Sequence, residues 1–291
     1  MRMKKLSNST RLINVLIGLS IPNPQYRPVL YERGYQLEYI EPHFTDTNGK
    51  LVNPDLQCKS HEEKNLVFFE CKLGAIEHEQ ALKYKGLTKE DIVNSNITSL
   101  DMSKCQFEII YFCDENSKEK VKKGDEIHKY GFPILSCNEN SISLEVNNIK
   151  GKVLNQIFSE GVKIPDKPPL SFYPFGPDDK ERYVAPAIFQ SLFRFCGVKV
   201  EFNEEDILRD SHPVYDSIHK DGQKKLKEIV GKIMNDLNEN EFKDVIKKFS
   251  TTHRYRINPR TQKKFRDLCL KKMEEYEKEE PQTNLSDFSN K

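Results

Sequence analysis

The spacing of apolar residues in the first third of the chain predicts strands. Residues 35–44 alternate moderately between apolar and polar side chains, and the run 66–73 is apolar until it reaches two charged residues. Asn48–Gly49 lies between extended segments and is a strong hairpin signal. We therefore predict an antiparallel meander with strands over residues 35–44, 51–58 and 66–73. Pro54 in the middle strand indicates an edge, a bulge or a bent ladder.

A helical pattern follows this meander. Residues 75–87 have helical spacing, and a second short helix is expected to begin near Thr88. The next segments alternate in type and are predicted to be a strand, a polar helix and a strand, over residues 106–113, 117–131 and 132–137. This order is typical of a parallel crossover. The first domain is therefore expected to be α/β, with a mixed sheet flanked by helices.

The second half of the chain is predicted to be mostly helical. Five prolines in residues 163–183 indicate an irregular connection. Beyond it, one long segment carries apolar residues on a single helical face, namely Leu226, Ile229, Val230, Ile233 and Leu237. We predict an α/β domain, a proline-rich connection, a helical basic domain and a flexible tail, over residues 1–162, 163–183, 184–280 and 281–291.

Composition narrows the class of protein only in part. A chain of 291 residues suits two domains, and its formal net charge of +1 indicates no partner. The seven cysteines include no Cys-x-x-Cys pair, which predicts reduced thiols in a cytoplasmic protein and no structural zinc. The apolar run 12–21 is too short to cross a membrane and lacks a cleavage site, so we expect neither secretion nor a membrane partner.

The charged residues that end the run 66–73 are the candidate chemistry. Glu70 and Lys72 lie on the same face of the predicted strand, about 7 Å apart, because strand side chains alternate. Asp55 on the neighbouring strand can lie opposite them. Two carboxylates brought together repel each other unless a cation is present, and Mg²⁺ (or Mn²⁺) prefers such oxygen ligands. The lysine could then orient or help deprotonate a water and stabilise a negatively charged phosphoryl group.

Pro54–Asp55, followed after fourteen residues by Glu70–Cys71–Lys72, resembles the motif of the PD-(D/E)xK, or restriction-endonuclease-like, nuclease superfamily. Gln80 and Tyr84 share a helix face and resemble the Gln-x-x-x-Tyr element of recombination helicase–nuclease domains. The resemblance implies a restriction-endonuclease-like core with Asp55, Glu70 and the Cys71 carbonyl as metal ligands. It further implies that Lys72 serves the attacking water, that Gln80 positions the metal or water, and that Tyr84 supports substrate or site.

Other readings of these residues remain open. The chain has two further Glu-x-Lys triplets, Glu62–Lys64 and Glu241–Lys243, although neither ends an apolar strand. An ion pair at an exposed strand end would explain Glu70 and Lys72 without any catalysis. Many members of the superfamily add an acidic residue from a preceding helix; here Glu32 or Glu38 would have to serve, and Glu38 is favoured because it lies on the first strand. His78 could contact a phosphate, or it could simply face water.

A strongly basic segment lies in the predicted helical domain. Residues 243–272 hold eleven Lys or Arg against two Asp, interleaved with aromatic residues. Such a segment suits contact with a phosphate backbone, and a solvated helix face or a surface for an acidic protein explains it equally well. Helices followed by a short extended basic segment also resemble a winged-helix module. The candidate nucleic-acid contacts are Lys83, Tyr84, Arg254, Arg256, Arg260, Lys263 and Lys264.

These features together predict a Mg²⁺-dependent nuclease that hydrolyses phosphodiester bonds. DNA is the expected substrate and defence against foreign DNA the expected role, since most proteins that share the resemblance act on DNA. Repair, transposon-end cleavage or action on RNA would give a similar sequence. The candidate protein partners are an ATPase or helicase, a transposase, or a second copy of the chain. The alternative is a non-catalytic nucleic-acid-binding or scaffold subunit that keeps the same fold.

Overall fold

The computed structural model describes residues 8–24, 27–123, 130–164, 172–249 and 254–278. The chain divides into two compact units. The first contains residues 1–173 together with a short segment from later in the chain, 216–221; the second contains residues 174–215 and 222–291. The division falls within the proline-rich stretch 163–183. The tail expected over residues 281–291 lies outside the described residues.

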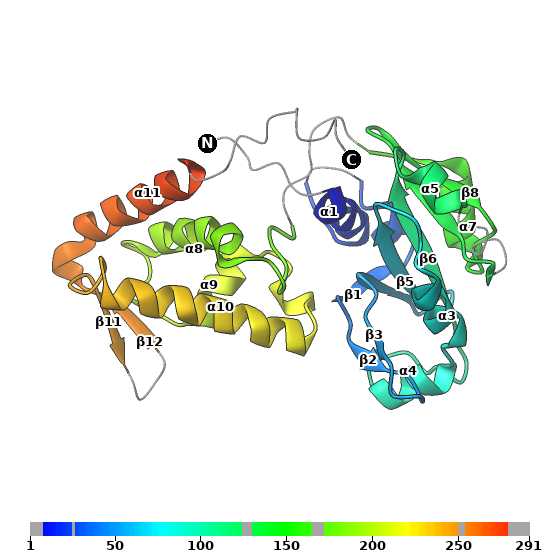
Figure 1. Ribbon diagram of the computed structural model, residues 1–291, viewed down its shortest axis with the longest axis horizontal. Helices are drawn as coiled ribbons and strands as arrows, with labels where there is room; N and C mark the ends of the chain where they lie inside the picture. The colour runs from blue at the N-terminus through cyan, green and yellow to red at the C-terminus, as the bar shows by residue number, and fades with distance from the viewer. Residues whose placement is uncertain (1–7, 25–26, 124–129, 165–171, 250–253, 279–291) are drawn as a thin grey trace. The chain divides into compact units, whose positions relative to one another are not determined.

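Unit 1 is built on a mixed sheet of seven strands in the order β1-β4-β5-β6-β7-β8-β9 (Figure 1). The strands are β1 (Gln36–Ile40), β4 (Leu56–Ser60), β5 (Asn65–Lys72), β6 (Gln106–Asp114), β7 (Ile134–Cys137), β8 (Ser141–Val146) and β9 (Val162–Lys163). Strands β1, β4 and β5 are antiparallel neighbours, while β5, β6 and β7 run parallel. The predicted α/β class, the parallel crossover and an antiparallel arrangement of the first three strands of this sheet are therefore confirmed. Strands β8 and β9 extend the sheet beyond the elements that we predicted.

The middle strand of the meander differs from the prediction. Residues 51–58 do not form one strand, because β3 (Leu51–Val52) pairs with β2 (Phe44–Thr45) in a separate two-stranded hairpin. Gly49 closes this hairpin with a φ of +77°, a conformation that glycine adopts without strain. Strand β4 begins only at Leu56. Pro54 and Asp55 thus occupy the step between the two strands, where a residue without an N–H interrupts no ladder.

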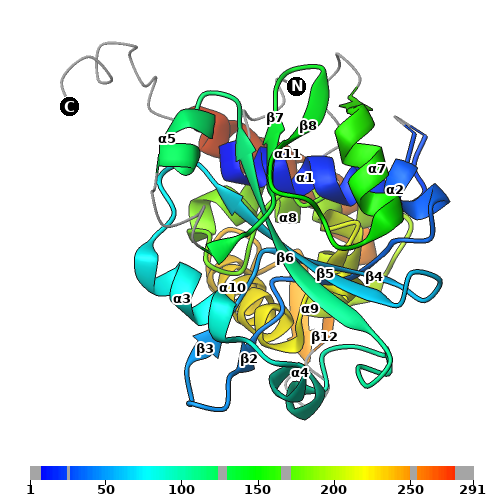
Figure 2. The same cartoon turned by 90° about the vertical axis from the view of Figure 1, so that its right-hand side faces the viewer.

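Alternation along β5 decides which helices cover each face of the sheet. Leu66 and Phe68 belong to a buried cluster with residues of α3 (His78–Gly86) and α4 (Lys89–Ser95). Strand β5 and these two helices are labelled in Figures 1 and 2. Val67 and Phe69 point to the opposite face, where α1 (Asn8–Ser20) packs on β5 and β6. Both helices predicted after the meander are confirmed, and Thr88 caps α4 in a capping box. Helices α2 (Val29–Glu32), α5 (Lys118–Lys123) and α7 (Lys152–Glu160) complete the unit.

Unit 2 is mostly helical, as predicted. Its helices are α8 (Glu181–Phe195), α9 (Glu204–Ser211), α11 (Gln262–Lys278) and, from Gly222 on, α10 (Lys220–Glu239). One short helical turn is η2 (Pro259–Thr261), and another, η1 (Tyr215–Ser217), leads into the segment 216–221 of unit 1. Strands β10 (Glu201–Phe202), β12 (Arg254–Ile257) and β11 (Ile246–Phe249) form a three-stranded antiparallel sheet in that order. The predicted apolar face of α10 is buried at Leu226, Val230, Ile233 and Leu237.

All seven cysteines are free thiols, and all but Cys196 are buried. This agrees with the reduced thiols expected from their spacing. Among the described residues, no helix combines the length and the apolar character that a membrane crossing requires.

Candidate functional site

The candidate residues Asp55 and Glu70 meet because the β4–β5 ladder continues one step beyond β4. Leu56 pairs with Phe69, and the N–H of Asp55 donates to the carbonyl oxygen of Phe69 at 3.1 Å. The side chain of Asp55 then turns toward the end of β5, where its Oδ2 accepts the N–H of Cys71 at 2.6 Å. The backbone of β5 therefore holds Asp55 beside Glu70 through two hydrogen bonds, independently of any ligand.

Glu70 and Lys72 share the face of β5 that carries Leu66 and Phe68, as the alternation predicts. The Lys72 Nζ lies 3.2 Å from Oε1 of Glu70, and the exposed fractions of the two side chains are 18% and 7%. The structure thus brings Asp55, Glu70 and Lys72 into one cluster at the carboxyl end of β5.

Helix α3 adds two further predicted residues to this cluster. Gln80 donates through Nε2 to Oε1 of Glu70 at 2.8 Å, and the hydroxyl of Tyr84 donates to Oε2 at 2.5 Å. The two side chains lie one turn apart, so a single helix face holds both oxygens of the carboxylate. Tyr84 is buried, with 3% of its surface exposed. Its position is that of a residue that orients Glu70, and so supports the site.

The cluster holds two carboxylates, Asp55 and Glu70, and the charge of Lys72 is too small to balance both. Burial raises the pKa of Asp55 well above its ordinary value, and repulsion from Glu70 raises it further, while the Cys71 N–H and Lys72 oppose the shift. Burial and the negative charge of Glu70 also raise the pKa of Tyr84, which keeps its hydroxyl a donor. Since taking a charge out of water costs several kcal/mol per ion, the pair favours a proton or a cation.

The donors present fit a hard divalent cation. Asp55, Glu70 and the Cys71 carbonyl are oxygen ligands of the kind that Mg²⁺ and Mn²⁺ prefer. Nearby, Oε1 of Gln80 is buried and accepts no hydrogen bond among the described residues. Its amide nitrogen is committed to Glu70, so this oxygen is directed away from that carboxylate and can accept a hydrogen bond from a bound water. The repulsion, the oxygen donors and this unsatisfied acceptor all match a hydrated cation.

A third carboxylate near the cluster is Glu41, which the sequence analysis missed. Its backbone N–H donates to the carbonyl oxygen of Asp55 at 2.9 Å, and its charge contributes to the raised pKa of Asp55. The hydroxyl of Tyr173 donates to its Oε1. Glu41 follows β1 directly, and the pairing of Ile40 with Leu56 brings residue 41 opposite residue 55. The register between β1 and β4, had it been known, would have identified Glu41 as a neighbour of Asp55.

The two acidic residues considered in its place have other partners. Glu38 accepts hydrogen bonds from Gln57 and Thr98, both at 2.8 Å, and pairs with Lys59 at 2.7 Å. These donors lower the pKa of Glu38, against the effect of its burial. Glu32 pairs with Arg27 at 2.6 Å on the surface. The charges of Glu70, Glu41 and Lys72 are those that contribute most to the pKa of Asp55.

A buried carboxylate elsewhere in unit 1 shows what a purely structural one looks like. Glu108 is 4% exposed and accepts the N–H groups of Lys150 and Gly151, at 2.7 and 3.1 Å, together with the amide of Asn65 at 2.8 Å. Glu108 joins a loop to the sheet, and its hydrogen bonds to the described residues include none that also binds a second carboxylate. The Asp55–Glu70 site differs, because backbone hydrogen bonds place one carboxylate next to another.

Other candidates near the cluster are placed less centrally. Lys83 is half-buried on α3, and His61 is exposed in the turn between β4 and β5. The Nδ1 of His78 shares a hydrogen bond with the hydroxyl of Tyr130 at 3.1 Å, and its side chain is exposed. None of the three has a hydrogen bond or ion pair to Asp55 or Glu70 in the described structure.

The basic segment of unit 2 divides into paired and unpaired cations. Arg256 forms an ion pair with Glu201, and Arg254 lies 4.0 Å from the same carboxylate. Lys264 lies 3.8 Å from Asp244. Among the described residues, Arg260 and Lys263 have no ion pair, and they line a shallow hollow on the first turns of α11 together with Lys264.

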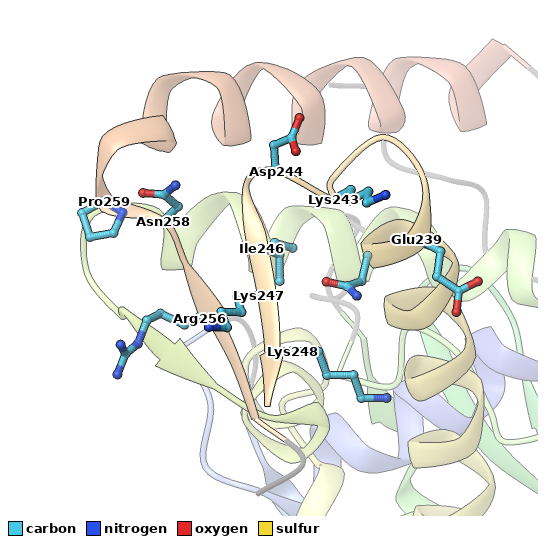
Figure 3. A pocket seen from close by; sticks show the side chains of 10 residues that line it. Glu239, Lys243, Asp244, Ile246, Lys247, Lys248, Arg256, Asn258 and Pro259 are labelled. Carbon is cyan, nitrogen blue, oxygen red and sulfur yellow. The ribbon is translucent and has the colours of Figure 1, made fainter. Parts of the chain in front are cut away.

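A second hollow in this unit lies between the end of α10 and the β11–β12 hairpin (Figure 3). Its basic lining consists of Lys243, Lys247, Lys248 and Arg256. Lys248 extends toward α10 and donates to Asn235 at 2.6 Å, whereas Arg256 extends to the other side of the hairpin. Several charges counted in the sequence are thus partly neutralised by acids outside residues 243–272, namely Glu201, Glu241 and Glu275.

The fold and the site define a mixed α/β domain whose central strand ends in a buried carboxylate–amine cluster, followed by a mostly helical unit. The chain belongs to the MJECL32 family, because the family model of the MJECL32 domain matches residues 8–173, more than half of the chain. Residues 176–288 match a domain of unknown function, DUF8601. The step between these two matches coincides with the division of the structure between residues 173 and 174.

Among curated proteins, the chain is similar to the uncharacterized protein MJECL32 of Methanocaldococcus jannaschii. The two are 27% identical over 170 residues, which is 52% of this chain and 37% of the relative. The chain therefore covers little more than a third of that relative's length. No solved structure matches the chain.

The raised pKa of Asp55 leads to a test of the carboxylate repulsion. A carboxyl whose pKa is raised on folding binds more protons in the folded state, so it removes stability as the pH rises from acid to neutral. Asp55→Asn removes the charge and keeps an oxygen to accept the Cys71 N–H. We expect the variant, in chelator at neutral pH, to unfold at a higher temperature, by about 2–4 °C for each kcal/mol of repulsion removed.

Thermal unfolding followed by circular dichroism measures this shift, and the gain should shrink as the pH is lowered. Mg²⁺ should raise the unfolding temperature of the original chain more than that of the variant. A variant less stable than the original at neutral pH in chelator would show that the Asp55 charge is compensated within the protein.

Proposed function

We propose that the chain is a metal-dependent nuclease that hydrolyses phosphodiester bonds, with DNA as its substrate. The observation that carries the proposal is the cluster at the end of β5. Asp55 and Glu70 are held side by side by backbone hydrogen bonds, Lys72 lies 3.2 Å from Glu70, and α3 fixes the carboxylate of Glu70. The resemblance to the PD-(D/E)xK superfamily supports the same reading, and the choice of DNA rests on that resemblance.

Asp55, Glu70 and the carbonyl of Cys71 would hold Mg²⁺ or Mn²⁺. When bound, such an ion offsets the carboxylate repulsion and polarises a phosphoryl oxygen. Gln80 and Tyr84 hold both oxygens of Glu70 in one orientation, so the ligand needs no reorganisation when the substrate arrives. The unsatisfied Oε1 of Gln80 would accept a hydrogen bond from the attacking water and so orient it.

Lys72 is the cation placed to serve the reacting atoms. Its Nζ is half-buried beside Glu70 and carries three donors on a flexible stem. It would hold the water oxygen or a non-bridging phosphate oxygen as negative charge develops there. In the reaction a bond forms between the water oxygen and phosphorus, the ester P–O bond breaks, and the leaving oxygen takes up a proton.

Unit 2 would bind the nucleic acid. Its elements follow the order α8-β10-α9-α10-β11-β12, with β12 in the middle of the sheet, and this order resembles a winged-helix module. Arg260, Lys263 and Lys264 form a basic surface at the start of α11, suited to a phosphate backbone. A role in defence against foreign DNA, with an ATPase, helicase or transposase as partner, fits this plan.

Substitution of Lys72 tests the catalytic part of the proposal. Lys72→Ala removes the only amine within ion-pair distance of Glu70 among the described residues and leaves the metal ligands in place. We expect cleavage of plasmid and linear DNA with Mg²⁺ to fall by about 100-fold or more, as for loss of a group that stabilises developing charge. The assay is the rate of product formation on gels.

Lys64→Ala is the matched control, because Lys64 belongs to the Glu62–Lys64 triplet of the same unit and is exposed. It should cut at the original rate. If the original chain and Lys72→Ala bind DNA equally and neither cuts DNA or RNA with Mg²⁺ or Mn²⁺, the non-catalytic scaffold reading replaces the nuclease.

The basic surface gives a second test, on binding. Arg260→Ala combined with Lys263→Ala removes two cations without an ion pair among the described residues, so it should weaken DNA binding and reduce the slope of log K against log salt by about 2. Lys272→Ala is the control, since Lys272 is paired with Glu241 at 2.6 Å and Glu275 at 2.9 Å. Fluorescence anisotropy at several salt concentrations measures both. Equal slopes for all three proteins would exclude this surface from the interface.

A further inference from the structure

Unit 1 contains a cluster of metal-binding side chains that is separate from the Asp55–Glu70 site. His43 lies between β1 and β2, and the other two members, His219 and Asp221, belong to the segment 216–221. This segment packs with unit 1, although it lies more than 40 residues after the rest of that unit in the sequence. Ile218 forms a parallel bridge with Ile40, and the N–H of His219 donates to the carbonyl oxygen of Ile40 at 3.1 Å. The backbone thus brings His219 alongside Ile40 at the end of β1, and His43 follows Ile40 by three residues.

The three side chains converge. One ligand atom from each of His43, His219 and Asp221 lies within 4.8 Å of the other two. The Nδ1 of His219 and Oδ2 of Asp221 are 3.6 Å apart, and the imidazole rings have a centroid separation of 5.8 Å. Ligands of a tetrahedral Zn²⁺ at about 2.0 Å are about 3.3 Å from one another. Small side-chain rotations would therefore close the set around an ion.

The environment of His219 also favours a ligand. Its Nδ1 is buried and makes no hydrogen bond among the described residues. The ring is held edge-on by Tyr39, with centroids 6.0 Å apart. An unsatisfied buried nitrogen costs free energy, and a metal ion would satisfy it.

We propose that His43, His219 and Asp221 form a binding site for a divalent transition-metal ion, with Zn²⁺ as the fitting occupant. Two imidazole nitrogens and one carboxylate oxygen suit Zn²⁺ and its neighbours in the transition series, whereas Mg²⁺ prefers an all-oxygen set such as Asp55 and Glu70. Three protein ligands leave a position for water, and Asp221 and the partly exposed histidines keep the site open to solvent.

This ion would fasten the segment 216–221 to the loop that carries Glu41. Residues 43 and 219 are distant in sequence. In the described residues, the backbone of the segment is joined to β1 by the Ile40–Ile218 bridge and the hydrogen bond from His219 to Ile40. Glu41, two residues before His43, donates its N–H to Asp55. The ion would therefore stabilise the position of Glu41 beside Asp55 without being a part of the acidic site.

Metal binding by the full chain tests the inference, with Co²⁺ as a spectroscopic substitute for Zn²⁺. After chelator treatment and dialysis, Co²⁺ should give visible absorption bands of a protein-bound, nitrogen-ligated ion, and one equivalent of Zn²⁺ should displace it. His43→Gln and His219→Gln should each weaken Co²⁺ binding by about 100-fold or more, since even loss of an outer-shell partner costs 10- to 100-fold. Circular dichroism in chelator checks that both variants fold.

His61→Ala is the control, because it removes an exposed histidine of the same unit and should leave the affinity unchanged. Asp55→Asn with Glu70→Gln should leave the Co²⁺ bands and abolish only the Mg²⁺ response, so failure of the nuclease proposal does not affect this result. If the original chain binds neither Co²⁺ nor Zn²⁺ stoichiometrically, or if folded His43→Gln and His219→Gln proteins bind as the original does, the proposal is wrong.

Discussion

Asp55 and Glu70 are kept close together by the backbone of the sheet, and the rest of the site depends on this constraint. The N–H of Asp55 donates to the carbonyl oxygen of Phe69, and its side chain accepts the N–H of Cys71. Asp55 is therefore held by the residues on both sides of Glu70. Asp55 cannot move away without breaking these two hydrogen bonds to β5. The repulsion is therefore built into the fold, and it adds to burial in raising the pKa of Asp55. A protein gains nothing in stability from such a pair, which indicates that it serves a ligand.

The surroundings of the pair preserve its orientation while only Lys72 compensates part of its charge. β5 is buried along both faces by α1 and by the helices α3 and α4, which makes the end of this strand a rigid base. Gln80 and Tyr84 then fix the carboxylate of Glu70, but both are neutral donors. Two other acids of the same domain each have their own set of hydrogen-bonding partners. Glu38 is paired with Lys59, and Glu108 is held by backbone N–H groups and an amide.

Local pattern predicted much of the fold and the centre of the candidate site. Period-2 alternation placed Glu70 and Lys72 on one face, and helical spacing placed Gln80 and Tyr84 together, because these relations depend only on neighbours in sequence. Glu41 was missed because its role depends on the register between β1 and β4. The segment 216–221 was missed because its pairing with Ile40 joins residues far apart in the chain. The charge of the basic segment was overstated because Glu201 and Glu241 neutralise it from outside the counted residues.

The central claim is that Asp55 and Glu70 bind a divalent cation, and anomalous X-ray scattering tests it most directly. Crystals of the full chain soaked in Mn²⁺ would be measured at a wavelength where manganese scatters anomalously. The account predicts a peak in contact with carboxylate oxygens of both Asp55 and Glu70 and with the Cys71 carbonyl, and no such peak in Glu70→Gln crystals. An original chain with ordered Asp55 and Glu70 side chains and no peak between them would contradict it.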